Sequence, residues 1–190
     1  MGMRLPREPW RGFVALLFRR VLLVLRGHDY AERPAAQVDE VLLQKIDVCW
    51  SVSVGLAMID TICGASFQSL SLLLALDAGE PWRLGRALAA EGAFVAMAGI
   101  GAERRAAALI KKARELCLRV GDPKLSALLE FCTGMTKFLV GKWAEAKDHQ
   151  LEAERLFADS GSALTWEALN ARLYWIWSLF YLGELKELSA

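Results

Sequence analysis

The sequence predicts an all-α fold, an α-solenoid built from antiparallel helix hairpins that stack on one another. Leu and Ala together supply 60 of the 190 residues and Pro only 5, a composition typical of packed helices. Glycines recur in two interleaved sets with spacings of 40 to 42 residues, namely Gly99, Gly141 and Gly183, and Gly79, Gly121 and Gly161. Two sets of turns predict two helices in each repeat of about 42 residues.

Local signals place the ends of these helices. A glycine just after the last apolar position ends a helix, and Asp122 followed by Pro123 begins one, as Glu80 and Pro81 do one repeat earlier. Together the signals predict helices over residues 38–58, 63–77, 81–98, 103–119, 123–140, 143–159 and 164–182. A single hairpin cannot bury both of its faces, so the hairpins are expected to form a continuous TPR-like stack, with a period longer than the roughly 34 residues of a standard TPR.

Residues 1–37 are expected to form an N-terminal amphipathic helix and a linker, followed by TPR-like repeats over residues 38–190. The stretch from Trp10 to Leu25 has helical periodicity, with arginines near one face and these apolar residues on the other: Trp10, Phe13, Leu17, Val21 and Val24. We expect this helix to cap the stack, and a basic helix lying on an anionic membrane is the alternative. The paired arginines in its middle argue against a signal peptide or a membrane span.

The length of the chain favours one compact domain, and no membrane span is expected. The longest relevant uncharged run, from Thr61 to Leu76, has 16 residues, fewer than the roughly 18 to 20 that a span requires.

The last predicted repeat is truncated, because a new helix begins after Gly183 and the sequence reaches Ala190 before that helix is complete. The helix before it is rich in aromatic residues, and four of them are predicted to form an exposed interaction face: Trp166, Tyr174, Trp175 and Trp177. Further repeats of a longer protein, a partner, or a second copy forming a homodimer could cover this face.

The residue inventory argues against catalysis. The sequence has no GxxxxGK[ST] loop, GxSxG elbow or HExxH pair, and its four cysteines show no CxxC spacing, so we expect no catalytic residue, metal or cofactor. His28 and His149 stand alone in the sequence and are expected to be solvated. The net charge of +1 supplies no global field for nucleic acid. We expect the four cysteines to be buried apolar residues that form no disulfide framework, which fits a reducing, cytoplasmic setting.

Partner binding is expected on the surface that the first helices of the repeats form. Four basic residues are candidates for it: Arg83, Arg86, Lys137 and Arg172. The densest basic stretch is the predicted helix 103–119, which carries Arg104, Arg105, Lys111, Lys112, Arg114 and Arg119. Its spacing is typical of a solvated helix face, and contact with an acidic or phosphorylated partner is the alternative.

Three stretches carry a resemblance: Ile46–Leu56 (IDVCWSVSVGL), Gly64–Glu91 (GASFQSLSLLLALDAGEPWRLGRALAAE) and Phe180–Leu185 (FYLGEL). They resemble the C-terminal repeat region of large bacterial serine/threonine protein kinases, in which a kinase domain and an AAA-type ATPase module precede TPR-like repeats. The resemblance runs from about Arg26 to Leu188. No kinase motif occurs in this sequence, so no kinase residue can be carried over.

The resemblance implies a non-catalytic module for signal transduction that binds a protein, a peptide or neighbouring kinase and ATPase domains. Two alternatives stay open. Similar solenoids sense small effectors in ATP-dependent transcriptional regulators, and a self-associating structural module would use the aromatic helix 164–182.

Overall fold

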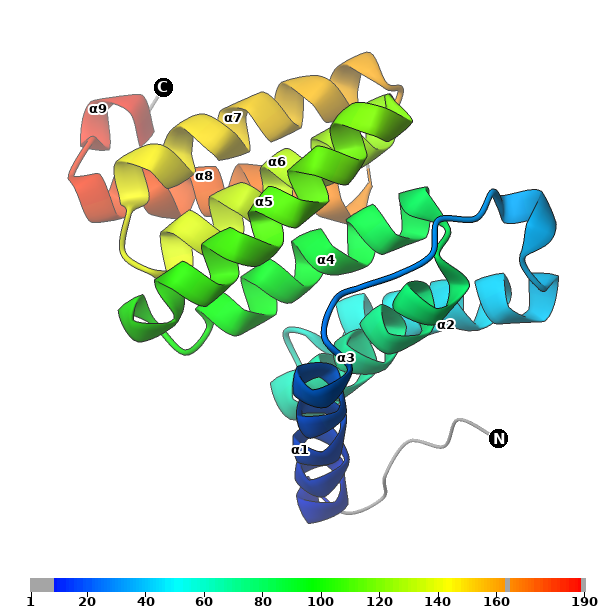
Figure 1. Cartoon of the computed structure of the whole chain (residues 1–190). Coiled ribbons are helices and arrows are strands. Elements are labelled where there is room, and N and C mark those ends of the chain that lie inside the picture. The colour runs from blue at the N-terminus through cyan, green and yellow to red at the C-terminus, as the bar shows by residue number, and fades with distance from the viewer. Residues whose placement is uncertain (1–8, 163–164, 189–190) are drawn as a thin grey trace. The chain divides into compact units, whose positions relative to one another are not determined.

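The computed structural model of the chain describes residues 9–162 and 165–188 (Figure 1). All regular secondary structure of these residues is helical, which confirms the predicted all-α class, and helices adjacent in the sequence pack in pairs. The α-helices are α1 (Pro9–Arg26), α2 (Glu40–Leu56), α3 (Thr61–Ala78), α4 (Pro81–Ala96), α5 (Glu103–Val120), α6 (Pro123–Leu139), α7 (Trp143–Asp159), α8 (Trp166–Leu182) and α9 (Leu185–Leu188). Short 3₁₀ turns, η1 (Ala35–Gln37) and η2 (Ile100–Ala102), precede α2 and α5.

The observed helix ends follow the local signals in the sequence to within a few residues. Side chains that accept hydrogen bonds from backbone N–H groups begin several helices, among them Asp39 for α2, Asp122 for α6 and Thr165 for α8. The six glycines that predicted the turns all have a positive φ, between 67° and 83°. The start of the predicted helix 164–182 and the outer ends of the segments 1–37 and 38–190 include residues outside the described part of the chain.

The helices form two compact units, residues 1–87 (unit 1) and residues 88–190 (unit 2), and the division falls inside α4. In unit 1, α2 and α3 form an antiparallel pair, since Ser53 donates a hydrogen bond to the carbonyl of Gly64 while Ser71 bonds to Ile46 further along. The side chains of α3 supply much of the core, and Leu72, Ala75 and Leu76 are almost fully buried. The pair therefore buries one shared apolar seam.

Helix α3 is the one described helix whose length and composition would allow it to cross a membrane. In the structure 67% of that segment is buried within the protein. Core helices of globular proteins have the same character, because an apolar helix surrounded by other helices needs no polar face.

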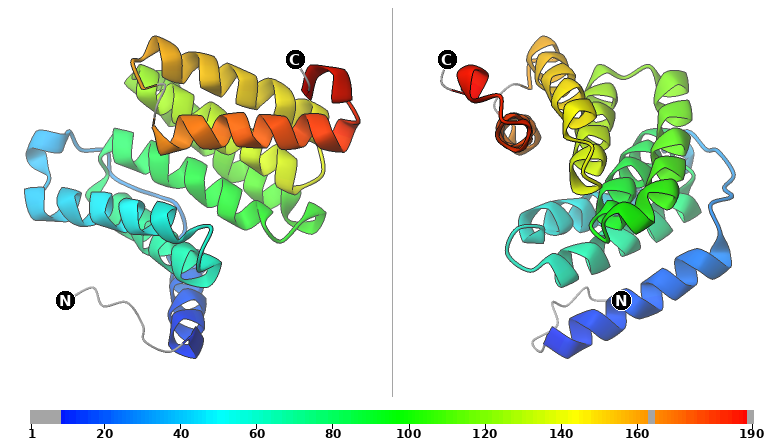
Figure 2. Two further views of the ribbon diagram at one scale, coloured as in Figure 1. Left: turned by 180° about the vertical axis from the view of Figure 1, so that it is seen from behind. Right: turned by 90° about the vertical axis from the view of Figure 1, so that its left-hand side faces the viewer.

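Helix α1 lies against α3 and runs in the same direction (Figure 2). Arg19 donates hydrogen bonds to Ser66, and Arg26 forms an ion pair with Asp77 at the other end of α3. The inner side of α1 therefore carries arginines, with Leu23 buried between them.

The outer face of α1 is apolar and open to solvent. It is formed by Trp10, Phe13, Val14, Leu17, Phe18, Val21, Leu22, Val24 and Leu25, which are 36% to 78% exposed. The side of α1 that packs on α3 is therefore the arginine side and not the apolar one. The long arginine side chains reach hydrogen-bond acceptors on α3, and the aliphatic and aromatic residues are left outside.

Unit 2 contains α5 to α9 and the second part of α4. Helices α6 and α7 form an antiparallel hairpin, in which Gly134 lies so close to the buried Gln150 that a Cβ atom there would be 2.6 Å from Nε2. Helix α8 packs against both of these helices, and α5 packs against α6 from the other side. This arrangement puts α6 at the centre of unit 2, between α5, α7 and α8.

Candidate functional site

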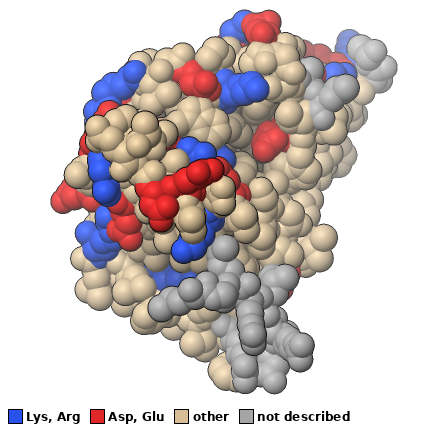
Figure 3. Space-filling model, turned by 90° about the vertical axis from the view of Figure 1, so that its right-hand side faces the viewer, with Lys and Arg blue, Asp and Glu red and all other residues tan. Residues whose placement is uncertain are grey.

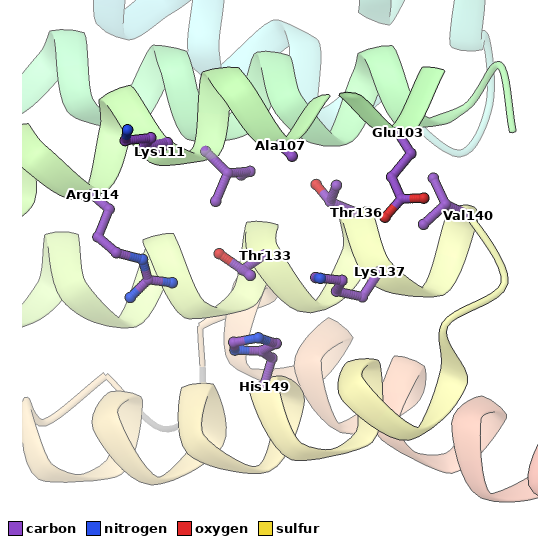
Figure 4. Close-up of a pocket in the computed structure, with 10 residues that line it drawn as sticks. Glu103, Ala107, Lys111, Arg114, Thr133, Thr136, Lys137, Val140 and His149 are labelled. Carbon is purple, nitrogen blue, oxygen red and sulfur yellow. The ribbon is translucent and has the colours of Figure 1, made fainter. Parts of the chain in front are cut away.

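A cavity of about 280 Å³ lies in unit 2 between α5, α6 and α7 (Figure 4). Its lining consists of Glu103, Ala107, Ile110, Lys111 and Arg114 from α5, Thr133, Thr136, Lys137 and Val140 from α6 and the turn after it, and His149 from α7. Helical spacing explains why α5 contributes so many residues, because positions three and four apart share one face. The cavity therefore joins an apolar lining with several charged groups.

Three basic side chains surround the cavity, and Glu103 is its one acidic lining residue. Lys111 is exposed on α5, with Arg114 one turn further along the same face, and Lys137 approaches from α6 (Figure 4). Lys111 could contact a negatively charged ligand, whereas Arg114 and Lys137 each pair with a carboxylate of the chain.

Arg114, Glu130 and His149 form a hydrogen-bonded group beside the cavity. Glu130 accepts a bond of 2.9 Å from Arg114 and lies 2.6 Å from Nδ1 of His149. Burial of the Glu130 carboxyl opposes its ionisation, but the hydrogen bonds from His149 and Arg114 outweigh burial, so its pKa lies below the ordinary value. The ionised Glu130 thus holds two cavity residues in place from two different helices.

Two further ion pairs connect the elements that line the other end of the cavity. Lys137 bonds to Glu145 across the α6–α7 hairpin, and Lys142 bonds to Glu103 of α5. The first pair connects α6 with α7, and the second connects α5 with the turn between α6 and α7, because Lys142 immediately precedes α7. Lys137 is held at the cavity rim by the first of these pairs.

The two hydroxyl groups in the cavity lining already donate hydrogen bonds within α6. Thr133 donates to the carbonyl of Leu129 and Thr136 to the carbonyl of Cys132, each one turn back in α6. Because neither hydroxyl proton is available to a ligand, recognition of a ligand would depend on the basic side chains.

Two of the four predicted partner-binding residues lie in unit 1, where they form an ionic cluster. Arg86 is only 6% exposed, its guanidinium pairs with Asp47 at 2.6 Å, and it lies 5.0 Å from the ring centres of both Trp50 and Trp82. Arg83 binds the same carboxylate. Burial of Asp47 opposes its ionisation, but hydrogen bonds from the two arginines lower its pKa overall.

The other two predicted residues lie in unit 2, and their surroundings differ. Lys137 lines the cavity, whereas Arg172 of α8 is exposed and pairs with Glu154 of α7. Of the four predicted residues only Lys137 reaches the cavity. The buried guanidinium of Arg86 is occupied by Asp47 within unit 1 and is not presented at the surface.

The aromatic residues of α8 are largely packed against α6 and its turn. Tyr174 is buried and lies 5.2 Å from the ring of Phe138, which also contacts Trp177, and Trp166 meets Phe131 edge to face. The predicted exposed face is therefore corrected for Tyr174. Trp175 and Trp177 are half-buried and Trp166 is 38% exposed, while Phe180 and Tyr181 are the large aromatics of α8 most open to solvent.

The four cysteines are buried, as predicted. Burial raises the pKa of Cys49 and Cys63 to about 11 and that of Cys132 to about 12, so these thiols stay protonated at neutral pH. Within the described residues no three side chains of His, Cys, Asp or Glu come together as metal ligands.

Sequence reasoning missed the bond between His149 and Glu130. Glu130 lies nine residues before the end of α6 and His149 six residues after the start of α7, so counting outward from the turn does not pair them. On the face drawn in Figure 3 basic and acidic side chains are interspersed, in keeping with a net charge of +1.

None of the protein-family models, curated proteins or solved structures compared with this chain matches it.

Proposed function

We propose that the chain is a non-catalytic helical-repeat module that binds an acidic segment of a partner protein at the cavity between α5, α6 and α7. The observation that carries this proposal is the cavity lining, in which Lys111, Arg114 and Lys137 surround an apolar hollow. An acidic side chain could meet these cations while a neighbouring apolar side chain of the partner enters the hollow.

The cavity is large enough for a peptide side chain. Pockets for drug-sized ligands and cofactors usually have volumes of about 300 to 1,000 Å³. The present cavity, at about 280 Å³, falls just below that range. One or two side chains of a bound peptide would fill it.

Two features support the non-catalytic part of the proposal. The buried cysteines Cys49, Cys63 and Cys132 have raised pKa values and so lack thiolate character. The imidazole of His149 faces the carboxylate of Glu130, and the lining hydroxyls of Thr133 and Thr136 donate to carbonyl groups of α6 instead of to the ring.

The arrangement of helices supports a TPR-like solenoid with a repeat of about 42 residues as the form of this module. Helices α4 and α6 begin at Pro81 and Pro123, 42 residues apart, and the paired helices α5 and α7 follow each of them. Stacked helix pairs offer extended surfaces to peptides and to neighbouring domains. We propose TPR-like repeats as the scaffold that presents the cavity.

The resemblance to bacterial serine/threonine protein kinases suggests the cellular setting. In that setting the module belongs to cytoplasmic signal transduction, and the acidic segment lies on a separate protein or on a neighbouring kinase or ATPase domain. A phosphorylated segment would offer the same negative charge to the three cations.

Selection of displayed peptides against the purified chain tests the proposal. We expect acidic sequences with a neighbouring apolar residue to be enriched on the wild type. Lys111→Glu should abolish that enrichment, because it reverses a charge at the cavity rim. The matched control is Lys112→Glu, which makes the same change at the next residue of α5, exposed but outside the cavity lining.

Equal enrichment of acidic peptides on Lys111→Glu and Lys112→Glu would place binding elsewhere. Selection of peptides without acidic residues would contradict the proposed partner chemistry. Both variants should keep the wild-type melting temperature to within a few degrees, because both positions are exposed.

A further inference from the structure

We propose that α1 attaches unit 1 to the surface of an anionic lipid bilayer, with the outer face of α1 inserted among the lipids. This inference is independent of the proposed peptide binding, which concerns unit 2. Helix α1 leaves a large apolar surface exposed. Seven large apolar side chains of this 18-residue helix are more than half exposed, with Leu25 at 78% and Val24 at 75%.

The breadth of the outer face favours a bilayer over a single partner helix. Successive residues of an α-helix are rotated by about 100°, so the exposed apolar positions cover about half of the helix circumference. A two-stranded coiled coil uses a narrower seam of two positions in seven. A planar, fluid apolar medium can cover half a helix, which is the geometry of helices that lie in the membrane interface.

The charge of α1 favours anionic lipid. The helix contains four arginines and no acidic residue. Arg20 falls at one edge of the outer face, between the apolar side and the side packed on α3, where a long side chain can reach toward phosphate groups.

The same charges prevent α1 from crossing the bilayer. A transmembrane helix needs about 20 mainly apolar residues, and arginines near the centre of a span are costly. Arg19 and Arg26 are also bound to α3, so the helix stays attached to unit 1. The geometry therefore points to a helix that lies along the membrane surface.

The loop between α2 and α3 extends the apolar surface. Met58 and Ile59 in this loop are 61% and 84% exposed, and Ile62 in the first turn of α3 is 43% exposed. Because α1 and α3 run in the same direction, the loop lies at the end of unit 1 reached by the first turns of α1 (Figure 2). These side chains can enter the interface together with Trp10.

Co-sedimentation of the full chain with lipid vesicles tests the inference. We expect the wild type to sediment with vesicles of phosphatidylcholine and phosphatidylglycerol, and much less with phosphatidylcholine alone. The double variant Phe18→Glu, Leu25→Glu should lose at least roughly tenfold in affinity for the anionic vesicles, because two inserted apolar groups become charged.

The matched control is Phe180→Glu, Leu118→Glu, which changes the same residue types at almost the same exposure in unit 2, 61% and 78% against 62% and 78%. It should bind vesicles like the wild type. The inference is overturned if the wild type does not sediment, or if both double variants bind equally. A dimer in lipid-free solution that Phe18→Glu, Leu25→Glu converts to a monomer would also overturn it, since a second copy would then cover the face.

Discussion

Glu130 of α6 and His149 of α7 face each other across the hairpin, with 2.6 Å between the carboxylate Oε2 and the ring Nδ1. Arg114 of α5 binds the other oxygen of the same carboxylate. One side chain thus connects the three helices that enclose the cavity. Its charge is needed for both contacts, and this makes the stability of unit 2 sensitive to the ionisation of Glu130.

The stability of the fold should fall at low pH in a way that depends on Glu130. Because the folded state lowers the pKa of this carboxyl, its contribution is fully present above the ordinary value of about 4.3 and is lost as pH falls through the folded value. Glu130→Gln should cost about 1 to 2 kcal/mol of unfolding free energy at neutral pH and weaken the acid sensitivity.

Glu115→Gln is the control for this prediction, because Glu115 is exposed on α5. Urea denaturation at neutral and acidic pH measures both effects. If Glu130→Gln and Glu115→Gln lose stability equally at neutral pH, the bonds to His149 and Arg114 do not stabilise the fold.

The ionic cluster of unit 1 should require arginine at position 86. Arg86→Lys keeps the charge but loses the flat guanidinium that lies between Trp50 and Trp82 and pairs with Asp47. We expect a loss of about 1 to 2 kcal/mol by thermal or urea denaturation. Arg105→Lys, at an exposed position of α5, should have no effect, and an equal loss in the two variants would count against the cluster.

The close approach of α6 and α7 should make Gly134 sensitive to a single methyl group. A Cβ atom at this position would lie 2.6 Å from Nε2 and 2.7 Å from Cδ of the buried Gln150. Gly134→Ala should therefore destabilise the fold by about 1 to 3 kcal/mol through overpacking.

Gly55→Ala provides the comparison, because Gly55 is also helical and has open space around it. Alanine there should be neutral or stabilising by up to about 1 kcal/mol, since it favours the helix. Chemical denaturation measures the free energy of unfolding of both variants. If Gly134→Ala stabilised the protein, α6 and α7 could move apart at no cost.

The buried thiols should resist alkylation in the folded chain. Burial raises the pKa of Cys132 to about 12 and that of Cys49 to about 11, so little thiolate is present at mildly alkaline pH. Iodoacetamide followed by mass spectrometry should modify all four cysteines only after denaturant is added. Rapid modification of the native protein at any of these sites would argue for a reactive, accessible cysteine.

The helix ends could be predicted from the sequence because they depend on neighbouring residues. Asp122 before Pro123 begins α6, and Gly121 ends α5 with a φ of 67°. Both signals act within one helical turn, so no distant contact is needed to interpret them.

The environment of particular side chains could not be predicted in this way, because it depends on distant partners. Arg86 is buried where it pairs with Asp47, which lies 39 residues earlier on another helix. Arg19 faces inward because Ser66 of α3 offers two oxygen acceptors. Periodicity identified the two faces of α1, but it could not say which face would meet α3.

The most direct test of the proposed binding site is the methyl NMR spectrum of isoleucine-labelled protein during titration with an acidic peptide from the selection. Ile110 lines the cavity, while Ile59 is exposed in unit 1. We expect the Ile110 methyl signal to shift with saturation, the Ile59 signal to stay unchanged, and Lys111→Glu to remove the shift. Saturable binding that leaves Ile110 unmoved would contradict a binding site between α5, α6 and α7.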